Sequence, residues 1–536
     1  MMLGKMMDRQ LTLDLILERG GRYFPEKEIV WRAESGVHRY AYADFFRRTK
    51  QLANALKKLG VEAGERVATF CWNHAQHLEL YFAIPITGAV LHTVNLRLFA
   101  EQIVYIFNHA EDRILFLDRS LFPLLAPLLG QLPRLKTIVL TGEGETPPAP
   151  AGKALLDYEA LIQDQPAVYD YPALEERTAL GLCYTSGTTG EPKGVLYSHR
   201  STVIHSLAAC LPAVVNLAET DSVLPAVPMF HANAWGLPYS CVLVGAKLVF
   251  PGRQLDPASL IELMASEEVT FSAGVPTIWA GILQLLDQKP GQLPRLKRMG
   301  LGGSAPPRSL FEGFRERHGI EVFQGWGMTE TSPAGTHGHV KSSLPQSGPA
   351  HYDIRTSQGI PAPLVEVKGL DEQGKEIPWD GKTMGHLVVR GPWIASGYFN
   401  NPSASEALLT PDGWMRTGDM ITINAHGYIK ITDRAKDLIK SGGEWISSVD
   451  MENTLMGHPK VAEAAVIAVP DPKWQERPLA VIVPKKDHSV TAAELRDYLL
   501  ARMAKWQVPD RFEFMTEIPK TSVGKFDKKV LRAKLT

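Results

Sequence analysis

The sequence predicts an α/β protein, α+β overall, in which a large N-terminal domain precedes a small C-terminal α+β domain. The large domain is expected to hold mostly parallel sheets covered by helices. Three observations support this prediction: a length of 536 residues, which exceeds one compact core; alternating strands and helices from about residue 245; and a change to short strands and helices after residue 447. Ligands of such folds gather in loops beyond the strand ends, so the large domain has room for a deep cleft.

The alternating region is defined by its apolar runs and its helix caps. Asp256 is placed to cap a helix whose first residue is Pro257. This helix stands between two β-rich apolar runs, and a further helical run follows them. The elements expected here are strands at 246–250, 269–273, 298–303 and 321–325, and helices from 257 and at 307–319.

Two segments are expected to be surface connections, one rich in proline and glycine at 141–153 and one polar at 339–359. The division into domains is predicted at 1–432 and 433–536, with the short polar stretch around Asp433 as the joint. A capping box of Thr491 and Glu494 predicts a helix in the second domain. A small mobile lid on a large body suits an enzyme that must exclude water.

Composition and charge exclude several classes of protein. A formal net charge of -1 argues against a nucleic-acid-binding or polybasic membrane surface. The apolar stretch 78–94 is interrupted by Glu79, Pro85 and His92, so no transmembrane segment is expected, and the N-terminus lacks a signal-peptide core. The cysteines show neither metal spacing nor CxxC pairing, which favours reduced thiols. We therefore expect a soluble, cytoplasmic protein.

A glycine- and hydroxyl-rich segment at 184–194, YTSGTTGEPKG, is the clearest candidate for an anion site. Lys193 follows Pro192 and precedes Gly194, so the segment is not the loop of kinases and GTPases. The run at Ser304 is not a hydrolase elbow because Pro306 occupies its last position, and the sequence contains no GxGxxG or HExxH motif. Hydrolase, dinucleotide-binding and zinc-protease functions therefore have little support.

The residue types of this segment suit a polyphosphate. Glycines at 187, 190 and 194 let the backbone turn its N–H groups inward, and the hydroxyls between them add donors. Lys193 supplies a cation. A triphosphate is the expected ligand. An isolated segment of this kind is equally compatible with a surface turn.

The segment and six others together resemble the adenylate-forming superfamily of acyl-CoA synthetases, peptide adenylation domains and firefly luciferase. The others are MFHANAW (229–235), GGSA (302–305), GWGMTE (325–330), GWMRTGD (413–419), DRAKDLIKSGGEWIS (433–447) and PKTSVGK (519–525). They follow in the family's order from residue 184 almost to the end. Within the superfamily the chain most resembles bacterial medium- and long-chain fatty acyl-CoA synthetases, including the branch of 3-methylthiopropionyl-CoA ligases.

The resemblance implies a reaction in two halves. A carboxylate attacks the α-phosphorus of ATP to give acyl-AMP and pyrophosphate, and the thiol of coenzyme A then displaces AMP. A carboxylate is ionised at neutral pH and needs no general base. The site should instead be dominated by cations and aimed donors that stabilise charge on the transferring phosphorus. ATP, Mg²⁺ and coenzyme A are the implied cofactors and cosubstrates.

The resemblance also assigns roles at the nucleotide. Glu330 is the expected Mg²⁺ ligand together with Thr185, Thr329 donates to the α-phosphate, and Asp419 binds the ribose. The residues expected to hold β- and γ-phosphates are Thr185, Ser186, Gly187, Thr188, Thr189, Gly190 and Lys193. Those expected around adenine and beside it are Gly302, Gly303, Ser304, Trp326, Gly327 and Met328, with Trp326 standing where the family more often has tyrosine.

The C-terminal motifs are expected to act in both halves of the reaction. Lys525 resembles the catalytic lysine that bridges the carboxylate and the α-phosphate, and Arg434 contacts ribose or phosphate. Asp433 resembles the hinge about which the small domain rotates between half-reactions. The residues expected along the pantetheine passage are Lys440, Ser441, Gly442, Gly443 and Trp445.

The acyl substrate is expected beside His231, Trp235 and Pro333, with Trp235 as an aromatic gate. The neighbours of His231 are apolar and include no lysine or arginine that would bind a second carboxylate. This favours an aliphatic monocarboxylic acid of medium to long chain. A short-chain acid such as 3-methylthiopropionate, and an acyl-AMP ligase that loads a separate carrier protein, are the alternatives. A non-catalytic binding protein is disfavoured by the intact lysine and glutamate, and a homodimer is compatible with the resemblance.

Overall fold

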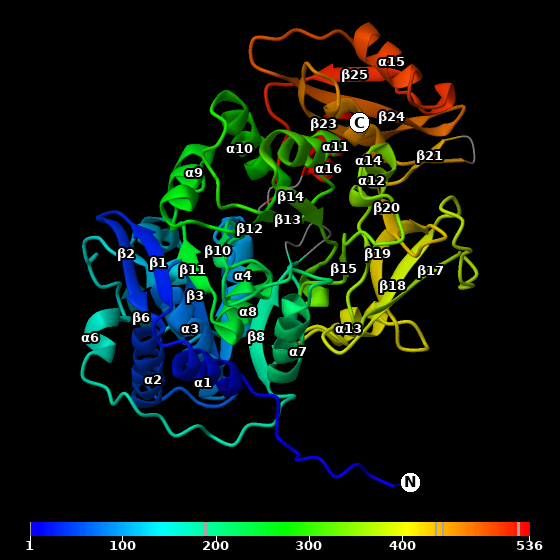
Figure 1. The fold of residues 1–536 in the computed structure, drawn as a ribbon. Helices are drawn as coiled ribbons and strands as arrows, with labels where there is room; N and C mark the ends of the chain where they lie inside the picture. Colours follow the sequence, from blue (N-terminus) through cyan, green and yellow to red (C-terminus); the bar gives the residue numbers. More distant parts are fainter. Residues whose placement is uncertain (1, 186–190, 435–436, 442–443, 522–525) are drawn as a thin grey trace.

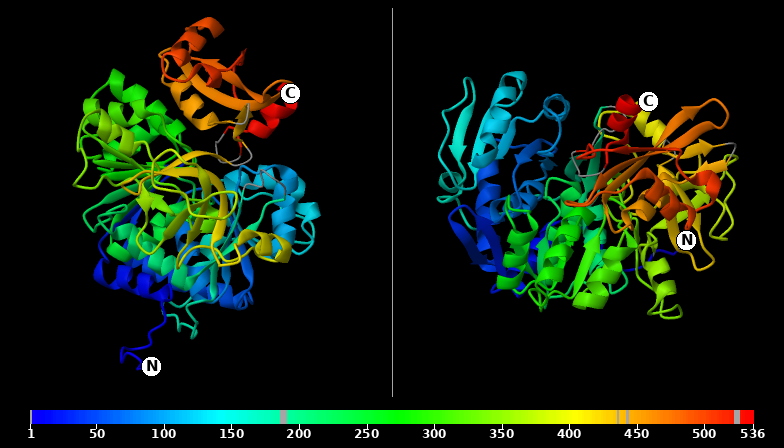
Figure 2. Two further views of the ribbon diagram at one scale, coloured as in Figure 1. Left: turned by 90° about the vertical axis from the view of Figure 1, so that its right-hand side faces the viewer. Right: turned by 90° about the horizontal axis from the view of Figure 1, so that it is seen from above.

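The computed structural model describes residues 2–185, 191–434, 437–441, 444–521 and 526–536. The chain forms a large lower body and a smaller lobe above it, which contains the C-terminal residues (Figure 1). Figure 2 shows that this lobe caps one side of the body rather than continuing its sheets. The α/β fold with a small C-terminal domain is as the sequence predicted.

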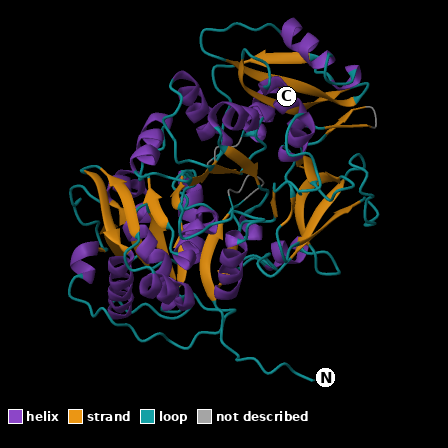
Figure 3. Ribbon diagram, viewed as in Figure 1, coloured by secondary structure: helices purple, strands orange, loops and turns teal. Residues whose placement is uncertain are grey.

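Two seven-stranded sheets, each mostly parallel, form the centre of the large body (Figure 3). In spatial order the first contains β14 (Glu321–Gln324), β13 (Arg298–Leu301), β12 (Phe271–Gly274), β10 (Ser222–Pro225), β11 (Lys247–Phe250), β1 (Glu28–Ala33) and β2 (Gly36–Ala41). The second contains β7 (Ala154–Asp157), β6 (Thr137–Thr141), β5 (Ile114–Asp118), β3 (Arg66–Phe70), β4 (Val90–Thr93), β8 (Ala179–Tyr184) and β9 (Gly194–Ser198). Only the pairs β1–β2 and β8–β9 are antiparallel. Parallel strands place their carboxyl ends, and the loops that follow them, on one edge.

Helices cover both sheets and fill the space between them. They are α1 (Asp14–Tyr23), α2 (Tyr42–Lys58), α3 (Ala75–Ile86), α4 (Ala100–Ala110), α5 (Phe122–Leu125), α6 (Tyr158–Ile162), α7 (His199–Cys210), α8 (Leu237–Val244), α9 (Pro257–Ser266), α10 (Pro276–Gln288), α11 (Arg308–Glu312) and α12 (Pro349–Arg355). Helix α3 contacts strands of both sheets. It carries most of the apolar stretch 78–94, which is therefore buried inside the protein. No helix within the described ranges is long and apolar enough to cross a membrane.

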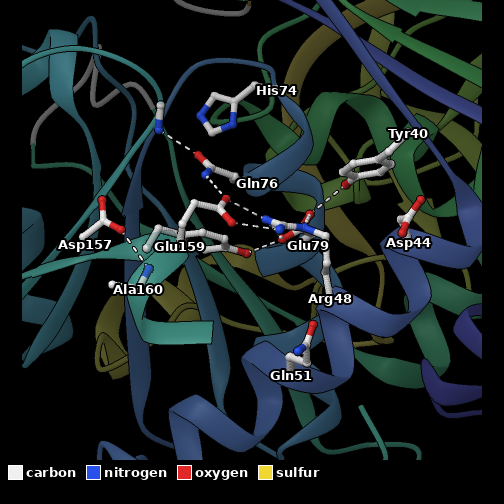
Figure 4. Close-up of polar contacts among 12 residues, drawn as sticks. Tyr40, Asp44, Arg48, Gln51, His74, Gln76, Glu79, Asp157, Glu159 and Ala160 are labelled. Atoms are coloured by element: carbon white, nitrogen blue, oxygen red, sulfur yellow. Dashed lines mark hydrogen bonds and ion pairs between the residues drawn. The ribbon is translucent and has the colours of Figure 1, made fainter. Parts of the chain in front are cut away.

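A buried ion cluster fastens the helices around α3 (Figure 4). Glu79 on α3 is fully buried and accepts hydrogen bonds from Tyr40 (2.8 Å), from Arg48 Nε (2.8 Å) and from Tyr158. Arg48 on α2 also pairs with Glu159 on α6 at 2.7 Å. Each oxygen of the Glu79 carboxylate thus has partners, which offsets the large cost of burying its charge. This cluster lies away from the cavity described below.

Four antiparallel strands extend the large body toward the small lobe. They are β17 (Glu366–Leu370), β18 (Gly385–Arg390), β19 (Met415–Ile423) and β20 (Ile429–Arg434), with α13 (Pro402–Leu408) beside them and the short pair β15 (Thr336–His337) and β16 (Ile360–Pro361) nearby. The short helical turns of the chain are η1 (Arg119–Leu121), η2 (Ala126–Gln131), η3 (Ala232–Gly236), η4 (Gly313–Arg317), η5 (Thr329–Thr331) and η6 (Lys505–Gln507). Asp433, the predicted joint, lies at the end of β20.

The small lobe is a five-stranded sheet with three helices. Its strands are β21 (Ile439–Ser441), β22 (Glu444–Ile446), β23 (Val461–Asp471), β24 (Gln475–Pro484) and β25 (Arg511–Phe514), and its helices are α14 (Ser448–Met456), α15 (Ala492–Leu500) and α16 (Lys528–Leu535). The predicted cap is present, since the Thr491 side chain accepts from the Glu494 N–H at 3.2 Å. The lobe has its own hydrophobic core, which includes Ile439, Val466 and Leu495.

Most elements expected between 246 and 325 are confirmed. The Asp256 carboxylate caps α9 by accepting from the Ser259 N–H at 3.0 Å. The helix expected at 307–319 is divided into α11 and the π-helical turn η4. The segment 339–359 is not wholly a surface connection, because α12 lies inside it and its Tyr352 packs into the core of the first sheet. All four cysteines are unpaired, as expected for reduced thiols.

Candidate active site

One cavity of about 1620 Å³ lies between the large body and the small lobe, with lining residues from both. It collects most of the predicted site: Thr185, Lys193, His231, Trp235, Gly302, Gly303, Ser304, Trp326, Gly327, Met328, Thr329, Glu330, Pro333, Asp419, Asp433 and Arg434. Predicted residues outside the described ranges are Ser186, Gly187, Thr188, Thr189, Gly190, Gly442, Gly443 and Lys525. Thr521 and Phe526, the described neighbours of 522–525, line the cavity. The last predicted motif therefore reaches the same space as the first.

The base of the predicted phosphate loop is closed by hydrogen bonds between its two ends. The Thr185 N–H donates to the Lys193 carbonyl at 2.9 Å, and the Lys193 N–H donates to Thr185 Oγ1 at 3.1 Å. Below them, Tyr184 pairs with Gly194 across β8 and β9. The Lys193 ammonium lies 5.0 Å from the centre of the Tyr398 ring. This arrangement brings the Lys193 cation to the lining of the cavity, and an anion site requires such a cation.

Thr329 and Glu330 lie in the short helix η5 and are largely buried, at 8% and 5% exposure. The Thr329 carbonyl accepts the Tyr197 hydroxyl at 2.8 Å, and the Glu330 carbonyl accepts the Ala395 N–H at 2.8 Å. The Glu330 side chain accepts the Tyr398 hydroxyl at Oε1, at 2.7 Å. Both the backbone and the carboxylate of Glu330 are therefore fixed in place.

The donor set around Glu330 fits a cation shared with a polyphosphate. Within the described residues, no group of three or more His, Cys, Asp or Glu side chains could hold a metal ion by itself. The second oxygen of the Glu330 carboxylate accepts no hydrogen bond from any described residue, and Thr185, which also lines the cavity, has a hydroxyl oxygen. Mg²⁺ is commonly held by one or two carboxylates together with substrate phosphates. Glu330 and Thr185 match that arrangement.

Asp419 is almost fully buried, with 2% exposure. Its Oδ2 accepts the Trp326 indole N–H at 2.9 Å, and its Oδ1 pairs with Arg434 Nε at 2.9 Å. The sequence assigned Trp326 to the adenine and Asp419 to the ribose, and the structure shows that they also contact each other. Carboxylate oxygens can accept more than one hydrogen bond, so Asp419 keeps capacity for hydroxyl groups of a ligand.

Close packing joins the glycine motifs to the predicted gate. A Cβ at Gly302 would lie 2.8 Å from the Trp235 ring, so only glycine fits beneath that ring. Gly303 has φ +86°, a conformation that favours glycine. A Cβ at Gly327 would lie 1.9 Å from the Pro333 carbonyl oxygen. These glycines bring the chain against Trp235 and Pro333, both assigned to the acyl substrate.

Part of the cavity lining is largely apolar. We call it the apolar end and define it by His205, Ala208, Ala209, Val215, Trp235, Leu237, Phe271, Ala273, Phe323 and His337. Burial lowers the pKa of His205 to about 4 and, with a smaller contribution from His339, that of His337 to about 4. Both rings are thus neutral at physiological pH. Sequence reasoning missed both, because neither lies in a motif and only the fold brings them to one cavity.

We call a second group of lining residues the polar end and define it by Thr185, Lys193, Glu330, Asp419 and Arg434. It contains both signs of charge, and most of its side chains contact one another or Tyr398. Tyr398 lines the cavity and was missed from the sequence. Its SGYFN context carries no charge or glycine pattern that indicates a site.

A buried network connects Asp433 to the last helix. The Asp433 Oδ2 accepts the backbone N–H and the hydroxyl of Ser448, at 2.7 and 2.5 Å. Lys528 on α16 donates to the Ser448 hydroxyl and pairs with Glu452 at 2.7 Å. Burial raises the pKa of both Asp433 and Glu452. The predicted hinge is therefore tied to the helix that begins just after Lys525.

Three of the predicted pantetheine residues lie elsewhere in this arrangement. Lys440, Ser441 and Trp445 belong to the hairpin of β21 and β22, at the edge of the lobe sheet, and do not line the cavity. The Lys440 ammonium lies 5.3 Å from the Trp445 ring, and Ser441 accepts a hydrogen bond from Arg477 at 3.2 Å. Their expected role belongs to a different orientation of the lobe and stays a prediction.

Comparisons with known proteins agree on one family. The model of the AMP-binding enzyme family matches residues 17–399, and that of the AMP-binding enzyme C-terminal domain matches residues 450–525. A long-chain fatty acid–CoA ligase of Thermus thermophilus is 51% identical over 98% of this chain and 96% of its own length. A medium-chain fatty acid–CoA ligase of Ectopseudomonas oleovorans is 44% identical over 99% of this chain and 97% of its own.

Two further relatives widen the range of acids. A 3-methylmercaptopropionyl-CoA ligase of Ruegeria lacuscaerulensis is 43% identical over 99% of this chain and 98% of its own length. Among solved structures, an anthranilate CoA ligase in complex with anthranoyl-AMP is 28% identical, with a TM-score of 0.88 and coverage of 98% of both chains.

Proposed function

This chain belongs to the AMP-binding enzyme family, and we propose that it activates medium- to long-chain fatty acids as coenzyme A thioesters. It is an AMP-forming acyl-CoA synthetase, an acid–thiol ligase that uses ATP and coenzyme A. The observation that carries the choice of acid is that one cavity is lined both by the charged residues of the polar end and by the residues of the apolar end. ATP requires charged and polar partners, whereas the hydrocarbon chain of an aliphatic acid requires an apolar surface.

In the first half-reaction, an oxygen of the fatty acid carboxylate bonds to the α-phosphorus of ATP, and the bond from that phosphorus to pyrophosphate breaks. The acid is already ionised, so neither neutral histidine of the apolar end is needed as a base. Lys193 and the backbone of the phosphate loop would hold the departing pyrophosphate. Asp419 would orient the ribose, and Arg434 and Lys525 would stabilise charge at the reacting phosphate.

Glu330 and Thr185 are the residues that would hold Mg²⁺. When bound, the ion neutralises charge on the phosphate oxygens and lowers the barrier to bringing a carboxylate against them. The geometry of Glu330 supports this assignment, because Tyr398 engages one carboxylate oxygen at 2.7 Å and the other carries no hydrogen bond from the described residues.

In the second half-reaction, the thiol of coenzyme A attacks the acyl carbon and AMP departs. We propose that the lobe, residues 433–536, rotates about Asp433 between the two steps and brings Lys440, Ser441, Gly442, Gly443 and Trp445 to the passage for pantetheine. The position of Asp433 supports this role, since it lies at the end of β20, the last strand before those of the lobe. Cytoplasmic location and a homodimer stay predictions.

The length of the acid is set by where the apolar end stops. The aliphatic and aromatic lining from Ala208 to Phe323 supports a hydrocarbon chain, and each buried methylene contributes about 0.8 kcal/mol. The relatives named for long- and medium-chain acids at 51% and 44% identity support the same choice. The runner-up is a short acid, favoured by the 3-methylmercaptopropionyl-CoA ligase at 43% identity.

A panel of acids tests the proposal. The purified enzyme is incubated with ATP, Mg²⁺ and coenzyme A and with each straight-chain acid from butanoic to octadecanoic, plus 3-methylthiopropionic acid, and kcat/KM is measured for acyl-CoA. We expect a maximum at medium to long chains. A maximum at 3-methylthiopropionic or butanoic acid would contradict the chain length. Acyl-AMP with no acyl-CoA for any acid would indicate a carrier protein as acceptor.

A further inference from the structure

Tyr398 touches the two charged groups of the polar end that come from separate motifs. Its hydroxyl donates to Glu330 Oε1 at 2.7 Å, and its ring lies 5.0 Å from the Lys193 ammonium. Glu330 and Lys193 are far apart in the sequence and come from different elements. Tyr398 is the described side chain that contacts both and also lines the cavity.

The backbone around Tyr398 is fastened to the same two elements. Two residues bracket it: the Ala395 N–H donates to the Glu330 carbonyl at 2.8 Å, and the Phe399 N–H donates to the Gly194 carbonyl at 2.8 Å. The Tyr398 N–H itself donates to the Ser405 hydroxyl at 2.8 Å. The segment 395–399 therefore spans from the metal-binding carboxylate to the end of the phosphate loop, with Tyr398 turned into the cavity between them.

The hydroxyl of Tyr398 suits a carboxylate that must present one oxygen to a cation. Donation to Oε1 restricts the rotation of the carboxyl group and leaves Oε2 without a hydrogen bond from the described residues. A phenol is protonated at physiological pH, so the hydroxyl can act as the donor to Glu330. Partners that orient a metal ligand in this way typically change metal affinity or activity by about 10- to 100-fold when they are removed.

The ring of Tyr398 has a separate effect on Lys193. An ammonium over an aromatic face is stabilised by about 0.5 to 1 kcal/mol at partly exposed sites. The contact holds the long lysine side chain at the cavity wall before any phosphate arrives, which reduces the conformational entropy lost on binding. The two effects depend on different parts of the tyrosine, so they can be separated by substitution.

We propose that Tyr398 is a positioning residue for adenylation, which orients Glu330 toward a divalent cation through its hydroxyl and places Lys193 for the polyphosphate through its ring. This inference rests on the proposed function, since Glu330 and Lys193 act on MgATP in that account. It assigns Tyr398 no contact with the reacting atoms. A role in packing alone would leave nucleotide and cation binding unchanged when only the hydroxyl is removed.

The test uses binding as well as turnover. Calorimetry measures the affinity of the full-length enzyme for α,β-methylene-ATP, first with EDTA and then at increasing Mg²⁺, without acid or coenzyme A. Tyr398→Phe should keep the affinity measured in EDTA and require about 10- to 100-fold more Mg²⁺ for the same gain. Tyr398→Leu should in addition lose about two- to fivefold of the affinity in EDTA, because the ring contact with Lys193 is gone.

Tyr428→Phe is the matched control. The Tyr428 hydroxyl donates a hydrogen bond as that of Tyr398 does, but to the backbone carbonyl of His339 at 2.8 Å, and Tyr428 lies outside the cavity lining. This variant should match the wild type in its Mg²⁺ requirement. Thermal unfolding of each variant checks that the fold is retained, and Tyr398→Phe keeps the ring and so its packing.

Two results decide between the accounts. A Mg²⁺ requirement for Tyr398→Phe equal to that of the wild type and of Tyr428→Phe would overturn the inference. The proposed function would survive that result, because the wild-type assay for acyl-CoA tests it alone. Pyrophosphate release by Tyr398→Phe should also show a lower kcat at limiting Mg²⁺ with an unchanged KM for the fatty acid.

Discussion

The polar and apolar ends of the cavity both contain titratable side chains but control them in opposite ways. At the polar end, Asp419 is 2% exposed and is paired with Arg434 and Trp326. At the apolar end, burial lowers the pKa of His205 and His337 to about 4. Paired charged side chains are therefore found where phosphates are expected to bind, and neutral side chains are found where a hydrocarbon chain is expected to lie. The difference explains how one cavity can accept two substrates of opposite polarity.

The largest expected effect comes from removing a cation at the polar end. Lys525→Ala should lower the rate of pyrophosphate release by about 10²- to 10³-fold, as loss of one preorganised group does at other transition states. The preference for chain length should be unchanged, because Lys525 is expected at the carboxylate and the α-phosphate and not at the hydrocarbon chain. Stopped-flow detection of pyrophosphate gives the rate, and Lys534→Ala, an exposed lysine of the same segment, is the control. Equal losses of rate in the two variants would contradict the expected role of Lys525 in adenylation.

A smaller effect is expected from the contact between the two nucleotide residues. Trp326→Phe removes the N–H donor to Asp419 Oδ2. A hydrogen bond to a charged group contributes about 1.5 to 3 kcal/mol, so the KM for ATP should rise about tenfold or more. The KM for the acid should not change. A rise in the KM for the acid with an unaltered KM for ATP would contradict the assignment of Trp326 and Asp419 to the nucleotide.

A change at the apolar end should act on chain length and leave the nucleotide alone. Val215→Phe adds a ring to the apolar end, where Val215 is partly exposed and so can accept added volume. Each methylene that is displaced should lower kcat/KM about fourfold, since it contributes about 0.8 kcal/mol, so long acids should lose more than short ones. The measurement is kcat/KM against chain length, with the KM for ATP as internal control. Equal losses for all chain lengths would show that Val215 does not contact the chain.

The smallest effect at neutral pH concerns the buried histidines. Their folded pKa of about 4 lies below the unfolded value near 6.5, so the unfolded chain binds more protons between these values. The free energy of unfolding should therefore fall as pH decreases from about 6.5 to 4, by up to roughly 3 kcal/mol for each histidine. The free energy of unfolding of His337→Gln should fall less over this pH range than that of the wild type. Denaturant unfolding at several pH values checks it, and identical pH profiles would show that His337 is not held neutral by burial.

A variant at the predicted hinge tests whether movement of the lobe is needed for both half-reactions. Asp433→Pro restricts the backbone at the predicted joint and should slow thioester formation from acyl-AMP more than adenylation. The two half-reactions are measured separately, and Asp433→Asn, which keeps the backbone free, is the matched variant. Normal thioester formation by Asp433→Pro would show that the joint lies elsewhere.

Sequence motifs located the polar end but described little of the apolar end. Glu330, Asp419 and Lys193 stand in motifs whose residue types state their chemistry, and the structure brings all three to one cavity. His205 and His337 have no such context, because their neutrality depends on burial between elements distant in the sequence. Tyr398 was missed for the same reason, since its role arises from contacts with two other motifs.

The fold, like the site, could be predicted from the sequence only where local residue patterns determine it. The strands and the Asp256 cap of the alternating region follow from local residue patterns, and they are confirmed. Helix α12 was missed inside a polar segment because its packing against the first sheet, through Tyr352, has no local signal. The order of strands within each sheet likewise depends on long-range pairing that a single sequence does not display.

The central claim is that a fatty acid is first joined to AMP in this cavity and only then passed to coenzyme A. A single-turnover reaction with dodecanoic acid, ATP and Mg²⁺ but no coenzyme A tests it most directly. We predict a burst of about one pyrophosphate and one dodecanoyl-AMP per enzyme, followed by dodecanoyl-CoA and AMP when coenzyme A is added. No pyrophosphate without coenzyme A, or ADP and phosphate as products, would contradict the account.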